Sequence, residues 1–143
     1  MMIKSQYNNR GFSLLELVVA IAIFSFGSVA MATLLIDSNV NTTISLERTN
    51  ALLYAKEGME AVRSIRDGDW SALVAGDHGL DNSGSDWVFS GSSDLIDNKF
   101  TRVVTIENVS TSTKNVSVAV AWSLREARPF RVTLDTVLTN WKQ

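Results

Sequence analysis

The fold is decided by residues 10–36, which read RGFSLLELVVAIAIFSFGSVAMATLLI. The last twenty of them, residues 17–36, contain no charged side chain and no proline. A helix rises about 1.5 Å per residue, so these twenty residues would span roughly 30 Å, which is the hydrocarbon thickness of a bilayer. The segment therefore predicts a membrane-spanning helix near the start of this 143-residue chain.

The residues before the apolar segment predict its orientation. Lys4 and Arg10 are basic and no acidic residue accompanies them. The positive-inside rule therefore places them in the cytoplasm and places the residues after Asp37 outside. An ordinary secretory signal would have small residues and a cleavage site after its apolar core. Here the candidate cleavage site, at Gly11, comes before the core.

Gly11, Phe12 and Glu16 together resemble the prepilin signature, in which a short basic leader ends in glycine, phenylalanine follows, and a glutamate opens an apolar helix. The resemblance implies that residues 1–11 form a cytoplasmic leader and that a membrane aspartyl prepilin peptidase cleaves between Gly11 and Phe12. It also implies N-methylation of Phe12 and retention of residues 12–36 as the transmembrane and assembly half of a long helix. The precursor would lie in the bacterial inner membrane as a single-pass protein. An assembly platform there would join it to other pilin subunits in a periplasmic or extracellular filament.

The chemistry of Glu16 supports the same interpretation. A carboxylate inside a membrane helix is costly, so it needs a partner. The amine exposed at Phe12 by cleavage is the obvious one. Phe12 and Glu16 are too close along one helix for ideal pairing, but they can meet between neighbouring chains, where the pair would set the axial register. The alternative is a plain membrane anchor in which Glu16 lies near the lipid headgroups.

Residues 37–66 carry the pattern of an amphipathic helix that continues the apolar one. Apolar residues recur mostly three or four positions apart, at Val40, Ile44, Leu52, Ala55, Met59 and Val62. The opposite face is polar, with Glu47, Arg48, Asn50, Lys56, Glu57, Glu60 and Arg63. We expect the helix to end at Asp67 and Gly68, with the glycine as its C-cap. We expect it to be weakest over residues 39–45, which are rich in β-branched and short polar side chains.

Residues 67–98 are predicted to form an acidic loop with one short strand at residues 87–89. This segment contains seven aspartates and no lysine or arginine. Residues 81–86 carry oxygen ligands that suit calcium, with Asp81 and Asp86 as the candidates, and some pseudopilins bind calcium in this part of the fold. The spacing does not fit an EF-hand loop. The sequence favours a solvated acidic loop, and we expect no cofactor.

Residues 99–141 are predicted to form an antiparallel sheet. Strands are expected at residues 100–107, 115–124 and 130–138, joined by residues 109–114 and 125–129. The middle strand alternates valine with small polar residues, so one face of the sheet is apolar and the helix of residues 37–66 is its natural cover. Residues 37–143 would then be an exported globular head. This α+β layout, a long N-terminal helix packed on a small antiparallel sheet, resembles the pilin fold.

Composition restricts the function classes. The chain has no cysteine, which excludes disulfides, thiolate metal sites and a cysteine nucleophile. Well-known major pilins carry a C-terminal disulfide pair, and often a proline late in the apolar helix. Their absence favours a minor pilin or a minor pseudopilin. The formal net charge of −2 gives no basic field for nucleic acid.

Three functions fit these features to different degrees. The first and preferred one is a structural subunit of a type IV pilus or of a pseudopilus, including a minor pseudopilin of type II secretion. The second is a ligand-binding minor pilin, adhesive or capturing DNA through Arg125, Arg128 and Arg131. Three arginines beside an acid are more often a solvated turn, so nucleic acid is not expected as a partner. The third is an enzyme built on His78 between Asp77 and Asp81, and a lone histidine in an acidic loop argues against it.

Overall fold

The computed structural model describes Gly11, residues 13–123 and residues 129–141. The chain divides into two compact units, Met1–Thr42 and Thr43–Gln143. The helix α1, Leu14–Gly68, contributes its first part to the first unit and its last part to the second. The boundary between the units falls within residues 39–45, the stretch predicted to be the weakest part of the helix, yet these residues are helical.

In the first unit, every described residue of α1 is exposed. Several of its hydroxyl groups bond to the helix itself. Ser25 and Ser28 each donate to the carbonyl oxygen four residues earlier, at 2.8 Å. Thr33 donates to the carbonyl oxygen of Ala30 at 2.9 Å. These side chains therefore need no water, and the helix is long and apolar enough to cross a membrane.

In the second unit, the buried face of α1 agrees in part with the predicted apolar face, because Ala55, Met59 and Val62 are buried. Its buried residues are Glu47, Ala51, Ala55, Gly58, Met59, Ala61, Val62 and Ile65. Val40 was expected on the apolar face but is 51% exposed. Glu47 was expected on the polar face but is buried, because it pairs with Lys99 of the sheet. Gly68 is the last helical residue and has no positive φ, so the predicted glycine C-cap is wrong.

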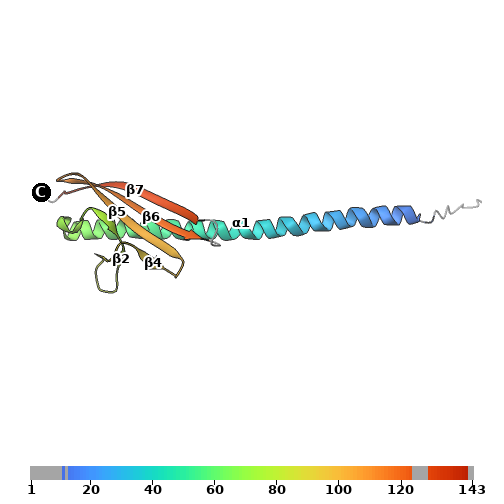
Figure 1. The fold of residues 1–143 in the computed structure, drawn as a ribbon, viewed down its shortest axis with the longest axis horizontal. Coiled ribbons are helices and arrows are strands. Elements are labelled where there is room, and N and C mark those ends of the chain that lie inside the picture. The colour runs from blue at the N-terminus through green and yellow to red at the C-terminus, as the bar shows by residue number, and fades with distance from the viewer. Residues whose placement is uncertain (1–10, 12, 124–128, 142–143) are drawn as a thin grey trace, which may run out of the picture. The chain divides into compact units, whose positions relative to one another are not determined.

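The main sheet contains three long antiparallel strands, β5 Phe100–Ser110, β6 Thr113–Ser123 and β7 Pro129–Thr139. They lie side by side against the green part of α1 (Figure 1). This confirms the α+β fold and the helix-on-sheet packing predicted from the sequence. The predicted connection at residues 109–114 is shorter, because β5 and β6 stay paired to Ser110 and Thr113 across an irregularity after Asn108.

Residues 67–98 are more ordered than the predicted loop. After a short 3-10 helix, Trp70–Ala72, come β1 Gly76–His78, β2 Leu80–Asp81, β3 Val88–Phe89 and β4 Asp94–Ile96. β3 is the predicted short strand, and it pairs with β2. β1 and β4 both pair with β5 and so extend the main sheet, whose path runs β1-β5-β6-β7. Each of these strands has only two or three residues, which is too few to show the alternation of apolar and polar side chains by which a strand is predicted.

The core lies between the sheet and the last part of α1. β6 contributes Val116, Val118, Val120 and Trp122, all nearly inaccessible to solvent. One cation is buried with them. The guanidinium of Arg102 donates to the Asp94 carboxylate, with Nη2 to Oδ2 at 2.9 Å, and to the carbonyl oxygen of Tyr54 at 3.2 Å. Because α1, β4 and β5 meet at this side chain, Arg102 holds the segment of residues 67–98 to the core.

Candidate processing and assembly site

The start of α1 is built by a capping serine. The backbone N–H of Leu15 donates to Ser13 Oγ at 3.3 Å, and the N–H of Leu17 donates to the Ser13 carbonyl oxygen at 3.1 Å. Ser13 is thus the N-cap, and Leu14 is the first helical residue. Phe12, the predicted new N-terminus, and the leader residues 1–10 lie outside the described residues.

Gly11 is exposed and uncrowded. A Cβ atom added there would meet no heavy atom within 4 Å, and the residue has no positive φ. Nothing in the described part of the chain therefore requires glycine at this position. A requirement for glycine would have to come from a molecule that approaches the backbone from outside.

Glu16 lies in the first turn of α1. It forms no hydrogen bond or ion pair with any other residue that the structure describes, and it is exposed. Its position three residues after Ser13 is that of the glutamate in a capping box, where a carboxylate also suits the positive end of the helix dipole. The pattern Ser13-Leu14-Leu15-Glu16 signals such a box, but Glu16 accepts no hydrogen bond from the Ser13 N–H, so only Ser13 caps the helix. The carboxylate is thus free to accept a partner from another molecule.

The surface after Glu16 is apolar on all sides. Leu17, Ile21, Phe24, Ile36 and their apolar neighbours are each more than half exposed or close to it. A contiguous apolar surface of this length does not stay in water on a soluble monomer. It needs lipid or other helices around it, and the single carboxylate at its start then becomes the only charge to be matched.

One family model matches the chain, over residues 6–32, and it describes the prokaryotic N-terminal methylation motif. The chain carries a prepilin-type signal. The matched residues include Gly11, Glu16 and much of the exposed apolar helix, and such signals are characteristic of type IV pilins and pseudopilins. The prepilin-type motif, together with the apolar helix, supports a membrane-anchored precursor of a pilin-like processed subunit. No curated protein and no solved structure matched the chain.

The calcium candidates are not brought together into a shared site. Asp81 accepts the Ser83 N–H at 2.8 Å and the Ser83 hydroxyl at 3.0 Å, and these bonds lower the pKa of its carboxyl group. Asp86 accepts the Ser85 hydroxyl at 3.3 Å. The two aspartates line different pockets, and the described residues contain no group of three or more acidic or histidine ligands suited to a metal.

His78 and its neighbours are occupied by structural contacts. Its Nε2 lies 2.8 Å from the carbonyl oxygen of Val74, and its ring lies 4.7 Å from the ring of Phe89. Asp77 accepts a hydrogen bond from the Thr105 hydroxyl at 2.7 Å. His78, at the end of β1, therefore packs against Phe89 of β3.

The predicted arginine cluster is only partly described. Arg125 and Arg128 lie outside the described residues. Arg131 is exposed on β7 and lines a groove beside α1, where Arg48 lies as well. The structure thus brings Arg131 together with a helix residue that the sequence analysis did not connect to it.

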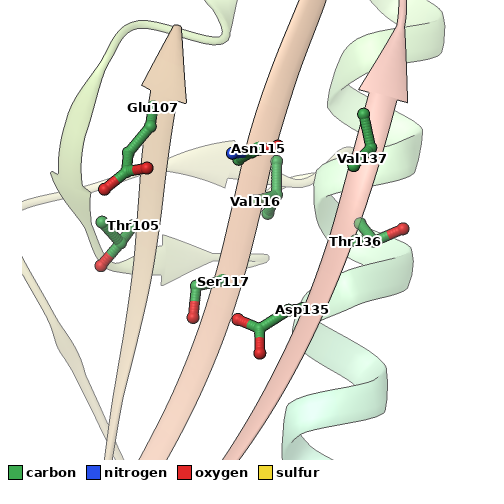
Figure 2. A pocket seen from close by; sticks show the side chains of 8 residues that line it. All are labelled: Thr105, Glu107, Asn115, Val116, Ser117, Asp135, Thr136 and Val137. Atoms are coloured by element: carbon green, nitrogen blue, oxygen red, sulfur yellow. The ribbon is translucent and has the colours of Figure 1, made fainter. Parts of the chain in front are cut away.

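A hollow on the sheet of the head was not predicted from the sequence. It has a volume of about 610 Å³. Figure 2 shows Thr105, Ser117 and Asp135 on three adjacent strands, and the strand register places them in one row. Glu107 and Asn115 continue the lining. These side chains offer carboxylates, hydroxyls and an amide, but no histidine or lysine that could act as a base beside a hydroxyl nucleophile.

Proposed function

We propose that this chain is a non-enzymatic structural subunit of a type IV pilus or a pseudopilus. The observation that carries the proposal is the methylation motif at residues 6–32, which leads directly into an exposed apolar helix. A secretory signal would be removed with its apolar core, whereas a prepilin-type signal leaves that core on the mature protein. The helix then serves first as the membrane anchor of the precursor and later as the assembly element of the filament.

Processing would occur between Gly11 and Phe12. The exposed, uncrowded backbone at Gly11 suits close approach by prepilin peptidase. Cleavage releases the leader with Lys4 and Arg10 on the cytoplasmic side and creates an amine at Phe12. Methylation of this amine would keep its positive charge.

Assembly would bring that amine to the Glu16 carboxylate of a neighbouring chain. In a packed bundle of apolar helices, each charge alone would lose its water, at a cost of several kcal/mol. The described residues provide no internal partner for Glu16. Pairing between chains removes the penalty for both groups only when the two helices are in the correct axial register.

The experiment is mass spectrometry of the mature subunit from sheared surface filaments or from the membrane. We expect an N-terminal peptide that begins at Phe12 and carries one methyl group. Gly11→Ala should leave the precursor uncut in the inner membrane. Gly27→Ala is the matched control, because a Cβ atom there also meets nothing within 4 Å, and it should be processed normally. A mature protein that begins at Ser28, or an uncut chain in filaments, would refute the proposal.

A further inference from the structure

We propose that a groove on the head, between α1 and β7, binds the phosphate headgroup of an anionic phospholipid in the membrane that anchors the precursor. The inference rests on the proposed function in one respect, namely that the apolar part of α1 is embedded in a bilayer before assembly. It goes beyond that function because it gives the head its own contact with the lipid surface. The evidence lies in the lining of the groove, in its charge and in its place along the sequence of α1.

The groove brings together two arginines that are far apart in the sequence. It has a volume of about 520 Å³. Its lining comes from α1 and β7 and consists of Ser45, Arg48, Thr49, Leu52, Arg131, Val132 and Thr133. Arg48 and Arg131 are exposed, whereas Leu52 and Val132 are half-buried. The fold thus places two guanidinium groups beside one hollow that also has apolar surface.

The positive charge of this groove is not balanced within the part of the head that the structure describes. Four other cations there have an acidic partner, in the pairs Arg63–Glu60, Arg66–Asp67, Lys99–Glu47 and Arg102–Asp94. Arg48 and Arg131 form no ion pair or hydrogen bond with any described residue. Glu47 is next to Arg48 in the sequence, but it is buried and paired with Lys99, so it does not neutralise Arg48.

The lining suits a phosphate that carries an apolar tail. A guanidinium presents its N–H groups in a planar fork that matches phosphate oxygens, and it is more weakly hydrated than an ammonium group. The hydroxyls of Ser45 and Thr133 have no hydrogen-bond partner among the described residues and can donate to the same anion. The side chains of Leu52 and Val132 can contact the glycerol and the first part of an acyl chain.

The sequence of α1 places the groove within a short length of helix from the lipid. Residues 36 to 45 are helical, so Ser45 follows the last apolar residue, Ile36, by a rise of about 13 Å. The headgroup layer adds roughly 5–8 Å to each side of the hydrocarbon core. Side chains on a helix lean toward its N-terminus, so Arg48 extends back toward that layer. Arg48 is also the first basic residue after Arg10.

Exposed apolar side chains precede the groove on the same helix. Val40 is 51% exposed and Leu46 is 62% exposed. Between residues 37 and 46 the only charged side chain is that of Asp37. A segment of this composition suits the boundary between lipid and water, where apolar side chains enter the acyl region and long cationic ones reach the headgroups.

The test uses the full-length chain in bilayer nanodiscs that contain phosphatidylglycerol as a minor component in phosphatidylcholine. The photoreactive residue p-benzoylphenylalanine replaces Thr133 in the groove, and mass spectrometry after illumination identifies the lipid attached to the chain. We expect phosphatidylglycerol to be enriched in these adducts over its share of the bilayer, by roughly fivefold for each arginine that contacts it. The same residue at Asn115, which is exposed on β6 and does not line the groove, is the control and should show no enrichment.

Single charge removals test whether the groove selects the lipid. Arg48→Gln should lower the enrichment roughly fivefold. Lys56→Gln removes an exposed charge from the same helix outside the groove and should leave the enrichment unchanged. Circular dichroism checks that both variants keep the native fold. Inorganic phosphate should reduce the enrichment no more than sodium chloride of equal ionic strength, because the membrane holds the lipid at a high effective concentration.

Four outcomes would overturn the inference while leaving the proposed function intact. Adducts at position 133 that are missing, or that follow the bilayer composition, would deny the contact. Equal losses in Arg48→Gln and Lys56→Gln would reduce it to general charge attraction. Loss of enrichment in inorganic phosphate alone would make the groove a site for free anions, and adducts to protein would assign it to another chain. A precursor that does not enter the bilayer would refute the membrane anchor of the proposed function instead.

Discussion

At the scale of the residue, two roles for Glu16 can be separated by experiment. As the third residue of the helix it occupies the glutamate position of a capping-box sequence with Ser13, where it forms no hydrogen bond and where a glutamine fits equally well. Under the proposed function its charge takes a cationic partner from another chain, and a neutral amide cannot serve there. The two roles therefore predict opposite outcomes for Glu16→Gln.

We expect both Glu16→Gln and Glu16→Leu to be cleaved normally and to accumulate in the membrane, but to enter filaments poorly. Loss of the carboxylate leaves the neighbouring amine without a partner in an apolar bundle. At a cost of about 3 kcal/mol or more, this would reduce incorporation roughly a hundredfold. Immunoblots of membrane and sheared-filament fractions measure the ratio. Normal incorporation of the glutamine variant alone would show that the carboxylate of Glu16 is not the register charge.

Gly58 is a second residue whose role can be tested. A Cβ atom there would lie 3.0 Å from both Arg102 Cδ and Val118 Cγ1. Alanine normally favours a helix by about 1 kcal/mol over glycine, but crowding a packed core costs about 1–3 kcal/mol. We expect Gly58→Ala to lower the free energy of unfolding by about 1 kcal/mol. Gly68→Ala, in the same helix with open space around it, should not destabilise the chain. Thermal unfolding in detergent measures the stability of both variants. Equal stabilities would show that the core side chains around Gly58 shift to make room for the added methyl group.

At the scale of the element, α1 and the β4–β5 hairpin are joined by a partly buried ion pair. Glu47 accepts from Lys99, and Tyr54, about two turns further along α1, donates to Asp97. The hydrogen bond to Asp97, with a smaller contribution from burial, raises the pKa of Tyr54. Asp97 and Asn98 both have a φ of 52°, so they form a tight turn of left-handed residues that presents Lys99 to the helix.

This ion pair predicts an asymmetric pair of variants. The Glu47 side chain is 9% exposed and that of Lys99 is 38% exposed, and Glu47 Oε2 has no hydrogen-bond partner. Lys99→Met leaves a buried carboxylate unpaired and should cost about 2 kcal/mol, less than for a fully buried pair because water reaches the site. Glu47→Leu combined with Lys99→Met should restore stability to within about 1 kcal/mol of the natural chain. Denaturant unfolding measures both, and a double variant as unstable as Lys99→Met would contradict this account.

The same elements show which features of the fold could be predicted from sequence patterns and which could not. The long strands could be predicted because Val116, Val118 and Val120 alternate with small residues over a continuous apolar face. The prepilin-type signal could be predicted because Gly11, Phe12 and Glu16 lie within six residues, and the methylation motif covers them. The burial of Glu47 could not, because its partner is 52 residues away. β1 and β4 were also missed, since they exist only through their pairing with β5 and have too few residues to show an alternation.

At the scale of the whole molecule, the two units depend on different environments. The buried apolar core is drawn from residues between Ala51 and Leu138, all in the second unit. The described residues before Thr43 are exposed and form no part of that core. The head therefore contains its own packing, whereas the first part of α1 gains its stabilisation from lipid or from other helices. Under the proposed function, this division would let one chain leave the membrane for a filament without unfolding its head.

The last prediction follows from that division. A shortened chain of residues 39–143 should be soluble and should unfold cooperatively, because it keeps the whole buried cluster and both partners of the Glu47–Lys99 pair. A head of about 100 residues with a packed core should melt at roughly 45–65 °C, as ordinary domains of this size do. Calcium and a chelator should leave that temperature unchanged, because Asp81 and Asp86 are engaged with neighbouring serines and line separate pockets. Circular dichroism during heating, with and without each addition, measures it. A shortened chain that is unfolded in buffer would contradict the independence of the head, and one that folds only with calcium would show that the acidic segment needs a metal after all.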